Sequence, residues 1–190
     1  MANLFPSYEK APSLRAALTQ RCALGRYAIL LIVAFTVINL LMLVSQTFAY
    51  FLFSANLPYL LVDFGMYFGG AYTNVDPALY EQGFGALGMG FFYGMLAATV
   101  ALLATYFVCW LCSSERCGRC LVTALVLFAI DTVVMLASLL ISEFNAAFVI
   151  DLACHAILLF LLVDGIRADR QLRALPPAGS SVPMPEESGF

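Results

Sequence analysis

Four cysteines stand within twelve residues in the stretch CWLCSSERCGRC, at Cys109, Cys112, Cys117 and Cys120. Their spacing, C-x2-C-x4-C-x2-C, supplies four thiols, and four thiolates are a common ligand set for tetrahedral Zn²⁺. Only four residues separate the two pairs, whereas zinc sites usually place a dozen or more between them. The pattern therefore leaves two interpretations open: a zinc site, or thiols that act as small apolar side chains at two helix ends.

Ionisable side chains interrupt the apolar second half of the chain at Asp131, Asp151 and His155, the only histidine. Asp151 and His155 are four residues apart and therefore share a helical face. Asp131 and His155 each lie twelve residues from Glu143, so two antiparallel helices joined there place them at the same depth. An aspartate at the centre of a bilayer costs about 2.5–3.5 kcal/mol and needs a partner. We therefore predict that Asp131 pairs with His155.

Two uncharged polar side chains, Asn39 and Thr99, are expected at the same depth on the first two apolar helices. One polar group from each helix could form a proton or ion relay. The same groups could instead be hydrogen-bonding contacts that hold helices together, worth roughly 0.6 kcal/mol each. A further alternative is a divalent metal site with two ligands spaced D-x3-H, composed of Asp131, Asp151, Cys154 and His155.

Composition places these residues in a membrane protein. The chain has 190 residues, of which 63% are hydrophobic and 11% charged, against about 25% charged in soluble domains. About 20 apolar residues cross the hydrocarbon core as a helix. Apolar runs predict an all-α, polytopic four-helix bundle with spans at 27–53, 85–109, 120–141 and 146–166. Residues 1–26 form a basic N-terminal segment, and the Pro/Ser/Gly-rich residues 167–190 a disordered tail.

Positive charge predicts the orientation. All nine Lys and Arg lie before the first span, between the second and third, or after the fourth. Because basic residues near span ends stay in the cytoplasm, we expect both termini inside a plasma membrane that the chain crosses four times. The expected partners are the lipid bilayer and another membrane protein or a second copy of this chain. No nucleic-acid partner is expected.

The segment between the first two spans predicts a short helix over 57–68. Asn56 and Pro58 suit a helix start, and Gly69-Gly70 a stop. One face carries Tyr59, Asp63 and Tyr67, and the opposite face carries Leu57, Leu60, Leu61, Phe64 and Phe68. This pattern is typical of a helix lying flat in the outer membrane interface with its apolar face down.

Small residues recur every fourth position along the second span, at Ala86, Gly90, Gly94 and Ala98. Such a stripe lets another helix approach closely. The partner helix could belong to the same chain or to a second protomer, and we favour packing within the chain.

Two neighbouring stretches, FTVINLLML (35–43) and FAYFLFSANLPYLL (48–61), form a first span that runs into an FLFSA-x-x-P segment. In this respect the chain resembles a family of small, uncharacterised membrane proteins of Gram-positive bacteria. The resemblance implies a bacterial cytoplasmic membrane and about four spans, and it implies no activity or catalytic residue. The four cysteines are not part of that pattern.

Enzymatic motifs are absent from the sequence, which contains no H-E-x-x-H, G-x-S-x-G or Gly-rich phosphate loop. We therefore expect a non-enzymatic accessory, scaffold or assembly subunit, without a cofactor unless the cysteines hold zinc. The alternative is a small ion- or proton-coupled transporter that uses Asp131 and His155.

Overall fold

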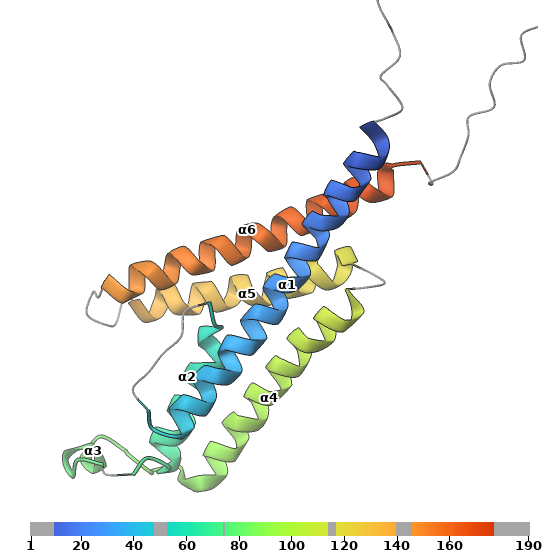
Figure 1. The fold of residues 1–190 in the computed structure, drawn as a ribbon. Coiled ribbons are helices and arrows are strands. Elements are labelled where there is room, and N and C mark those ends of the chain that lie inside the picture. Colours follow the sequence, from blue (N-terminus) through green and yellow to red (C-terminus); the bar gives the residue numbers. More distant parts are fainter. Residues whose placement is uncertain (1–9, 48–52, 74, 114–116, 140–145, 177–190) are drawn as a thin grey trace, which may run out of the picture.

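The computed structural model describes residues 10–47, 53–73, 75–113, 117–139 and 146–176, and all regular secondary structure in these ranges is helical (Figure 1). The helices are α1 (Lys10–Val44), α2 (Asn56–Gly69), α3 (Ala78–Glu81), α4 (Gly88–Cys112), α5 (Cys117–Leu139) and α6 (Ala146–Ala174). Four of them, α1, α4, α5 and α6, are long and apolar enough to cross a membrane. The predicted four-span helical bundle is therefore confirmed.

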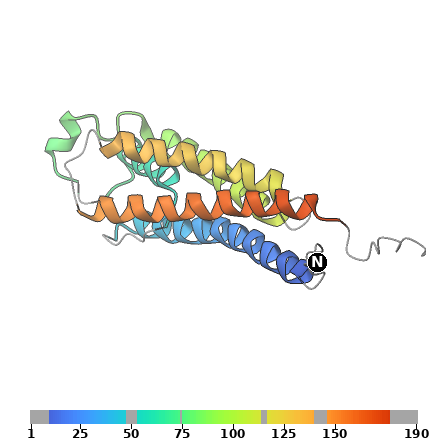
Figure 2. The ribbon, with the colours of Figure 1, turned by 90° about the horizontal axis from the view of Figure 1, so that it is seen from above.

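The core of the bundle lies where α1, α5 and α6 meet, and α1 also contacts α4 (Figures 1 and 2). Its main hydrophobic cluster includes the buried side chains Ile29, Ile32, Leu121, Phe128, Leu158 and Leu162. The outer faces are apolar as well: Leu41, Val133 and Phe160 are each 64% exposed. A helix that is apolar on all sides suits a membrane, where lipid covers the outer face.

Two helices extend further than the sequence predicted. α1 begins at Lys10 and so includes most of the segment before residue 27, and α6 continues to Ala174 rather than ending near residue 166. The bounds of α4 and α5 lie within three residues of their predicted positions.

The two extensions are helical because they pack on each other. Nε of Arg21 donates to Oδ2 of Asp164 at 2.7 Å, and the thiol of Cys22 lies 3.5 Å from the carbonyl oxygen of Gly165. Leu18, Cys22 and Ala168 form a small buried cluster beside these contacts. An ion pair and apolar contacts thus continue the α1–α6 interface past the hydrophobic spans.

The predicted helix between the first two spans exists as α2, but it does not lie flat across the end of the bundle. α1 ends at Val44, before its predicted end at residue 53, and α2 packs along α4 and also contacts α1. Pro58 near the start of α2 contacts Thr99, and Gly69 at its end lies against Phe92. α2 therefore runs antiparallel to α4, from the middle of the bundle towards one end.

Glycines explain this placement. A Cβ on Gly65 would lie 2.9 Å from Cβ of Met95, and a Cβ on Gly69 would lie 2.7 Å from Cβ of Phe92. The buried face of α2 is Pro58, Val62, Gly65, Met66 and Gly69. The predicted apolar face is not the packed one, and its Phe64 is 51% exposed. Close backbone approach, rather than bulk hydrophobicity, decides which face packs.

The predicted stop of α2 is present at Gly70, whose φ of 77° ends the helix in the left-handed region that glycine adopts without strain. Beyond it, the Tyr72 hydroxyl donates to the carboxylate of Asp63. Burial, followed by this hydrogen bond, raises the pKa of Tyr72.

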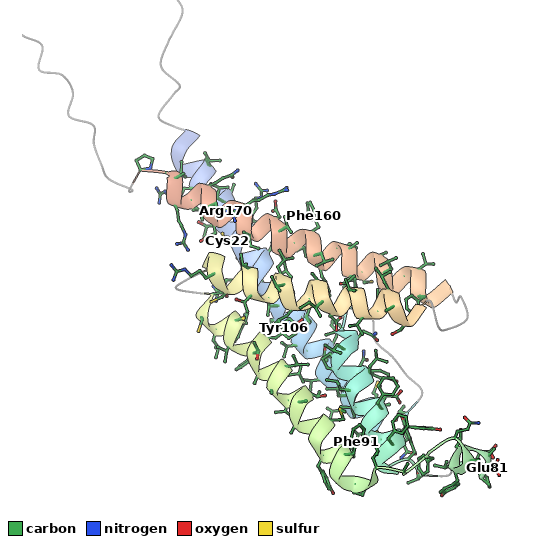
Figure 3. All side chains as sticks on the ribbon, turned by 180° about the vertical axis from the view of Figure 1, so that it is seen from behind. Cys22, Glu81, Phe91, Tyr106, Phe160 and Arg170 are labelled. Carbon is green, nitrogen blue, oxygen red and sulfur yellow. The ribbon has the colours of Figure 1, made fainter. Side chains whose placement is uncertain are left out.

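The two ends of the bundle differ in charge. We call one the basic end: its described arginines are Arg15, Arg21 and Arg26 of α1, Arg119 of α5, and Arg167, Arg170 and Arg173 of α6. The other, the acidic end, carries Asp76 and Glu81 around α3. Figure 3 shows Arg170 and Glu81 at these opposite ends.

Candidate functional site

Asp131, on α5, accepts hydrogen bonds from the start of α2. The backbone N–H of Asn56 donates to Oδ2 at 2.9 Å, and that of Leu57 donates to Oδ1 at 2.5 Å. Asp131 is 1% exposed. A helix start presents unpaired N–H groups and a partial positive charge, so a carboxylate is well placed there.

Every backbone N–H group at the start of α2 has a hydrogen-bond acceptor. The first four nitrogens of a helix lack partners within the helix. In α2 the N–H of Ala55 donates to Oγ1 of Thr36 at 2.8 Å, Asn56 and Leu57 donate to Asp131, and Pro58 has no N–H. The hydrophobic interior therefore holds this helix start without an unpaired amide.

His155, on α6, lies between two carboxylates. Its Nε2 is 3.3 Å from Oδ2 of Asp131, and its Nδ1 is 3.0 Å from the backbone oxygen and 3.6 Å from Oδ1 of Asp151. The ring stacks on Phe128 with centroids 4.8 Å apart and an interplanar angle of 7°. The structure thus brings Asp131 and His155 together as predicted, with Asp151 beside them.

Two further polar contacts surround the start of α2. Nδ2 of Asn39, on α1, donates to Oγ of Ser54 at 2.8 Å, and Oγ1 of Thr99, on α4, donates to the carbonyl of Pro58 at 3.4 Å. Each of the four long helices therefore contributes polar side chains to one buried region. We call Thr36, Asn39, Thr99, Asp131, Asp151 and His155 the polar cluster.

The sequence predicted most residues of the polar cluster, but it did not predict that they surround the start of α2. It expected the side chains to face one another, whereas Asp131, Thr36 and Thr99 contact the backbone of α2. The available signal was the combination of Ser54, Asn56 and Pro58, which suits a helix start inside an otherwise apolar segment. Chemically, the arrangement can anchor a half-length helix, and it links two carboxylates through an imidazole that can carry a proton.

The cysteines divide between the core and the surface. Cys109 is buried in the main core cluster, Cys120 packs against that cluster, and Cys112 is exposed. The side chain of Cys117 lies outside the described part of the structure. Within the described part, no three His, Cys, Asp or Glu side chains are placed to share a metal ion, the Asp131–Asp151–Cys154–His155 set included. Zinc at the four cysteines stays a prediction, which metal analysis of the purified protein tests.

Gly90 and Gly94 do not pack within the chain as we expected. A Cβ on either residue would meet nothing within 4 Å in the described structure. Ala97, Ala98, Ala101 and Ala104 on α4 are exposed too, and Ala86, also exposed, precedes the helix. The internal-packing interpretation is therefore wrong, because α2 and α1 cover the opposite side of α4, which carries Phe92, Thr99 and Tyr106. A second chain as the partner of this stripe stays a prediction.

No protein-family model, curated protein or solved structure matches the chain. The class of the protein is therefore defined by the fold alone. It is a multi-pass helical membrane protein with four spanning helices and a shorter helix that begins inside the bundle.

Proposed function

We propose that the protein is a non-enzymatic accessory or assembly subunit that packs against a helix of another membrane-embedded chain through the outward face of α4. The observation that carries this proposal is the open space beside Gly90 and Gly94. We call the exposed small residues of α4 the α4 stripe: Gly90, Gly94, Ala97, Ala98, Ala101 and Ala104.

The coverage of α4 supports this proposal. Only 17% of its most apolar window is buried, against 33–39% for the other three spans. Small residues favour helix association in lipid because two backbones can then come into van der Waals contact. The chain uses this device internally where α2 meets α4 at Gly65 and Gly69. The α4 stripe offers the same kind of surface on the side that the chain itself leaves uncovered.

In this proposal the polar cluster is structural. Both oxygens of Asp131 accept hydrogen bonds from α2, so the carboxylate fixes that helix inside the bundle. Fixing α2 also fixes the opposite side of α4 and keeps the α4 stripe turned outwards.

Site-specific photocrosslinking in the native membrane tests the proposal. A photoreactive phenylalanine analogue replaces Tyr93, which is 59% exposed beside the stripe, and in a matched control it replaces Phe160, which is 64% exposed on α6. We expect one discrete adduct from position 93 that disappears when Gly90→Ile and Gly94→Ile are added. Equal adducts from both positions, or an adduct that survives the isoleucines, would refute the assembly role.

The same experiment identifies the partner. An adduct of twice the 20.7 kDa chain mass means a second copy, and any other discrete mass means a different membrane protein. Ala153→Ile with Ala156→Ile, at exposed small residues of α6, adds the same bulk away from α4 and should leave the adduct intact.

A second candidate function is ion- or proton-coupled transport. It is favoured by one observation: α2 starts inside the bundle and directs its positive end at Asp131, which contacts His155. Helices broken near the bilayer midplane form substrate and ion sites in many transporters.

Flux measurements in liposomes with a pH gradient test the transport candidate. Asp131→Asn and His155→Ala should abolish flux, while Asp76→Asn at the exposed acidic end should not. Flux that is the same in all four proteins would eliminate this candidate, provided that each variant retains its helical circular dichroism.

We also propose that the membrane is a bacterial plasma membrane and that both termini are cytoplasmic. The clustering of the described arginines at the basic end supports this orientation, since basic residues near span ends are retained inside.

A further inference from the structure

A pocket of about 370 Å³ opens at the basic end, between the first turns of α5 and the last turns of α6. Val122 and Ile166 supply apolar lining, and Arg119, Arg170 and Arg173 supply positive charge. Figure 3 shows Arg170 at this end of α6. The pocket is far from the polar cluster along α5 and α6, and it is not part of the α4 stripe.

Among the described residues, the one acidic side chain that lines the pocket, Asp169, is already paired with an arginine. Asp169 accepts from Nε of Arg173 at 2.9 Å and from Nη2 at 3.4 Å. Asp169 also lies against the start of α5, where a Cβ on Gly118 would clash with its Oδ2. The carboxylate therefore occupies the positive end of α5 and is held there by its own arginine.

Two guanidinium groups remain for a ligand. Neither Arg119 nor Arg170 has a side-chain hydrogen bond or ion pair with any residue in the described ranges, and both are exposed. Elsewhere at the basic end, Arg21 is paired with Asp164, and Arg26 donates to Ser113 at 2.9 Å. The pocket thus brings together two unpaired arginines, whereas Arg21 and Arg26 at the same end already have partners.

We propose that this pocket binds a phosphate-bearing group through Arg119 and Arg170. A guanidinium presents a planar fork of donors that matches phosphate oxygens, and two such groups on facing helices can hold one phosphate from both sides. Val122 lines the pocket near the start of α5 and is 39% exposed, so the acyl chains of an anionic lipid bound here would lie against the apolar surface of α5. Basic pockets between spanning helices commonly take lipid head groups in this way.

The ligand has two possible sources, an anionic phospholipid or free phosphate, and native mass spectrometry of the detergent-purified protein separates them. One arm adds phosphatidylglycerol, a second adds phosphatidylcholine, and a third adds inorganic phosphate. We expect the first arm to give a one-to-one adduct at least fivefold more abundant than the second. Binding of inorganic phosphate alone would support the pocket but identify a soluble ligand.

Two double variants test whether the adduct forms in the pocket. Arg119→Gln with Arg170→Gln should reduce the adduct at least fivefold. Arg15→Gln with Arg167→Gln removes two charges from the same end outside the pocket and should leave the adduct unchanged. Equal losses in both double variants would overturn the proposal in favour of general attraction to a basic surface, and so would the absence of any adduct in the wild type.

A third variant distinguishes loss of the binding site from loss of the fold. Val122→Trp fills the pocket while retaining every arginine, and Val122 is 39% exposed, so the ring can be accommodated without entering the core. This variant should lose the adduct while its melting temperature stays within a few degrees of wild type. Undiminished binding in a stable Val122→Trp protein would contradict the proposal.

Discussion

The backbone N–H of Asn56 donates a 2.9 Å hydrogen bond to Oδ2 of Asp131, 75 positions further along the chain. A helix start is commonly capped by the side chain of the residue just before it. α2 is preceded by Ala55, which makes no such hydrogen bond, so its cap comes from another helix. The place of α2 in the bundle is therefore tied to α5.

Removing this cap should destabilise the protein strongly. We expect Asp131→Ala to lower the free energy of unfolding by about 3–5 kcal/mol, because two buried amides and His155 lose their partner together. Asp131→Asn keeps an acceptor oxygen and should cost less. Unfolding by SDS in mixed micelles measures both, and faster hydrogen exchange confined to α2 would locate the effect.

Asp76→Ala serves as the matched control for the cap. Asp76 also accepts from a helix-start amide, that of Ala78 at 2.9 Å, but it is exposed. Its loss should cost about 1 kcal/mol. A similar cost for Asp131→Ala would show that the buried cap contributes little.

Glycines on α2 and α4 should respond in opposite ways to substitution. Gly69→Ala places a Cβ 2.7 Å from Phe92 Cβ and 3.2 Å from its backbone nitrogen, so the helices must separate. We expect destabilisation by about 1–3 kcal/mol. Gly90→Ala meets open space and should be neutral or stabilising by up to about 1 kcal/mol through helix propensity. Melting temperatures of the two variants in the same detergent measure the difference. Equal changes would contradict the placement of Gly69 on a packed face and Gly90 on an open face.

The crossing of α1 and α6 depends on a second pair of glycines. A Cβ on Gly165 would lie 3.2 Å from Cα of Gly25, and a Cβ on Gly25 would lie 3.3 Å from Cα of Gly165. Either alanine alone should cost about 1–3 kcal/mol.

The double variant Gly25→Ala/Gly165→Ala should cost less than the sum of the two single changes, because the first already moves the helices apart. Residues in contact typically deviate from additivity by about 0.5–3 kcal/mol. Strict additivity in a double-mutant cycle would show that the two positions do not share a contact.

The proposed orientation predicts which end reacts from outside. Thr73 and Gln171 are both exposed, the first near the acidic end and the second at the basic end. With a membrane-impermeant maleimide on intact cells, Thr73→Cys should gain labelling over wild type, whereas Gln171→Cys should gain it only after permeabilisation. The reverse pattern would invert the topology.

Much of the architecture was predictable because it depends on local properties of the sequence. Apolar runs of sufficient length predicted the four spans, and equal spacing from Glu143 predicted that Asp131 lies beside His155. In two antiparallel helices, residues twelve positions before and after the same point of the chain reach the same depth, whatever the other helices do. That pairing therefore required only helical geometry.

Only the tertiary structure decided where α2 lies and which side of α4 is covered. In a soluble protein the buried face is the apolar one, but in a membrane the faces that meet lipid and protein are both apolar. Hydropathy therefore could not distinguish Gly65 and Gly69, which pack, from Gly90 and Gly94, which do not. The distinction arises from shape, from the backbone donors at the start of α2, and from the Asp131 carboxylate that receives them.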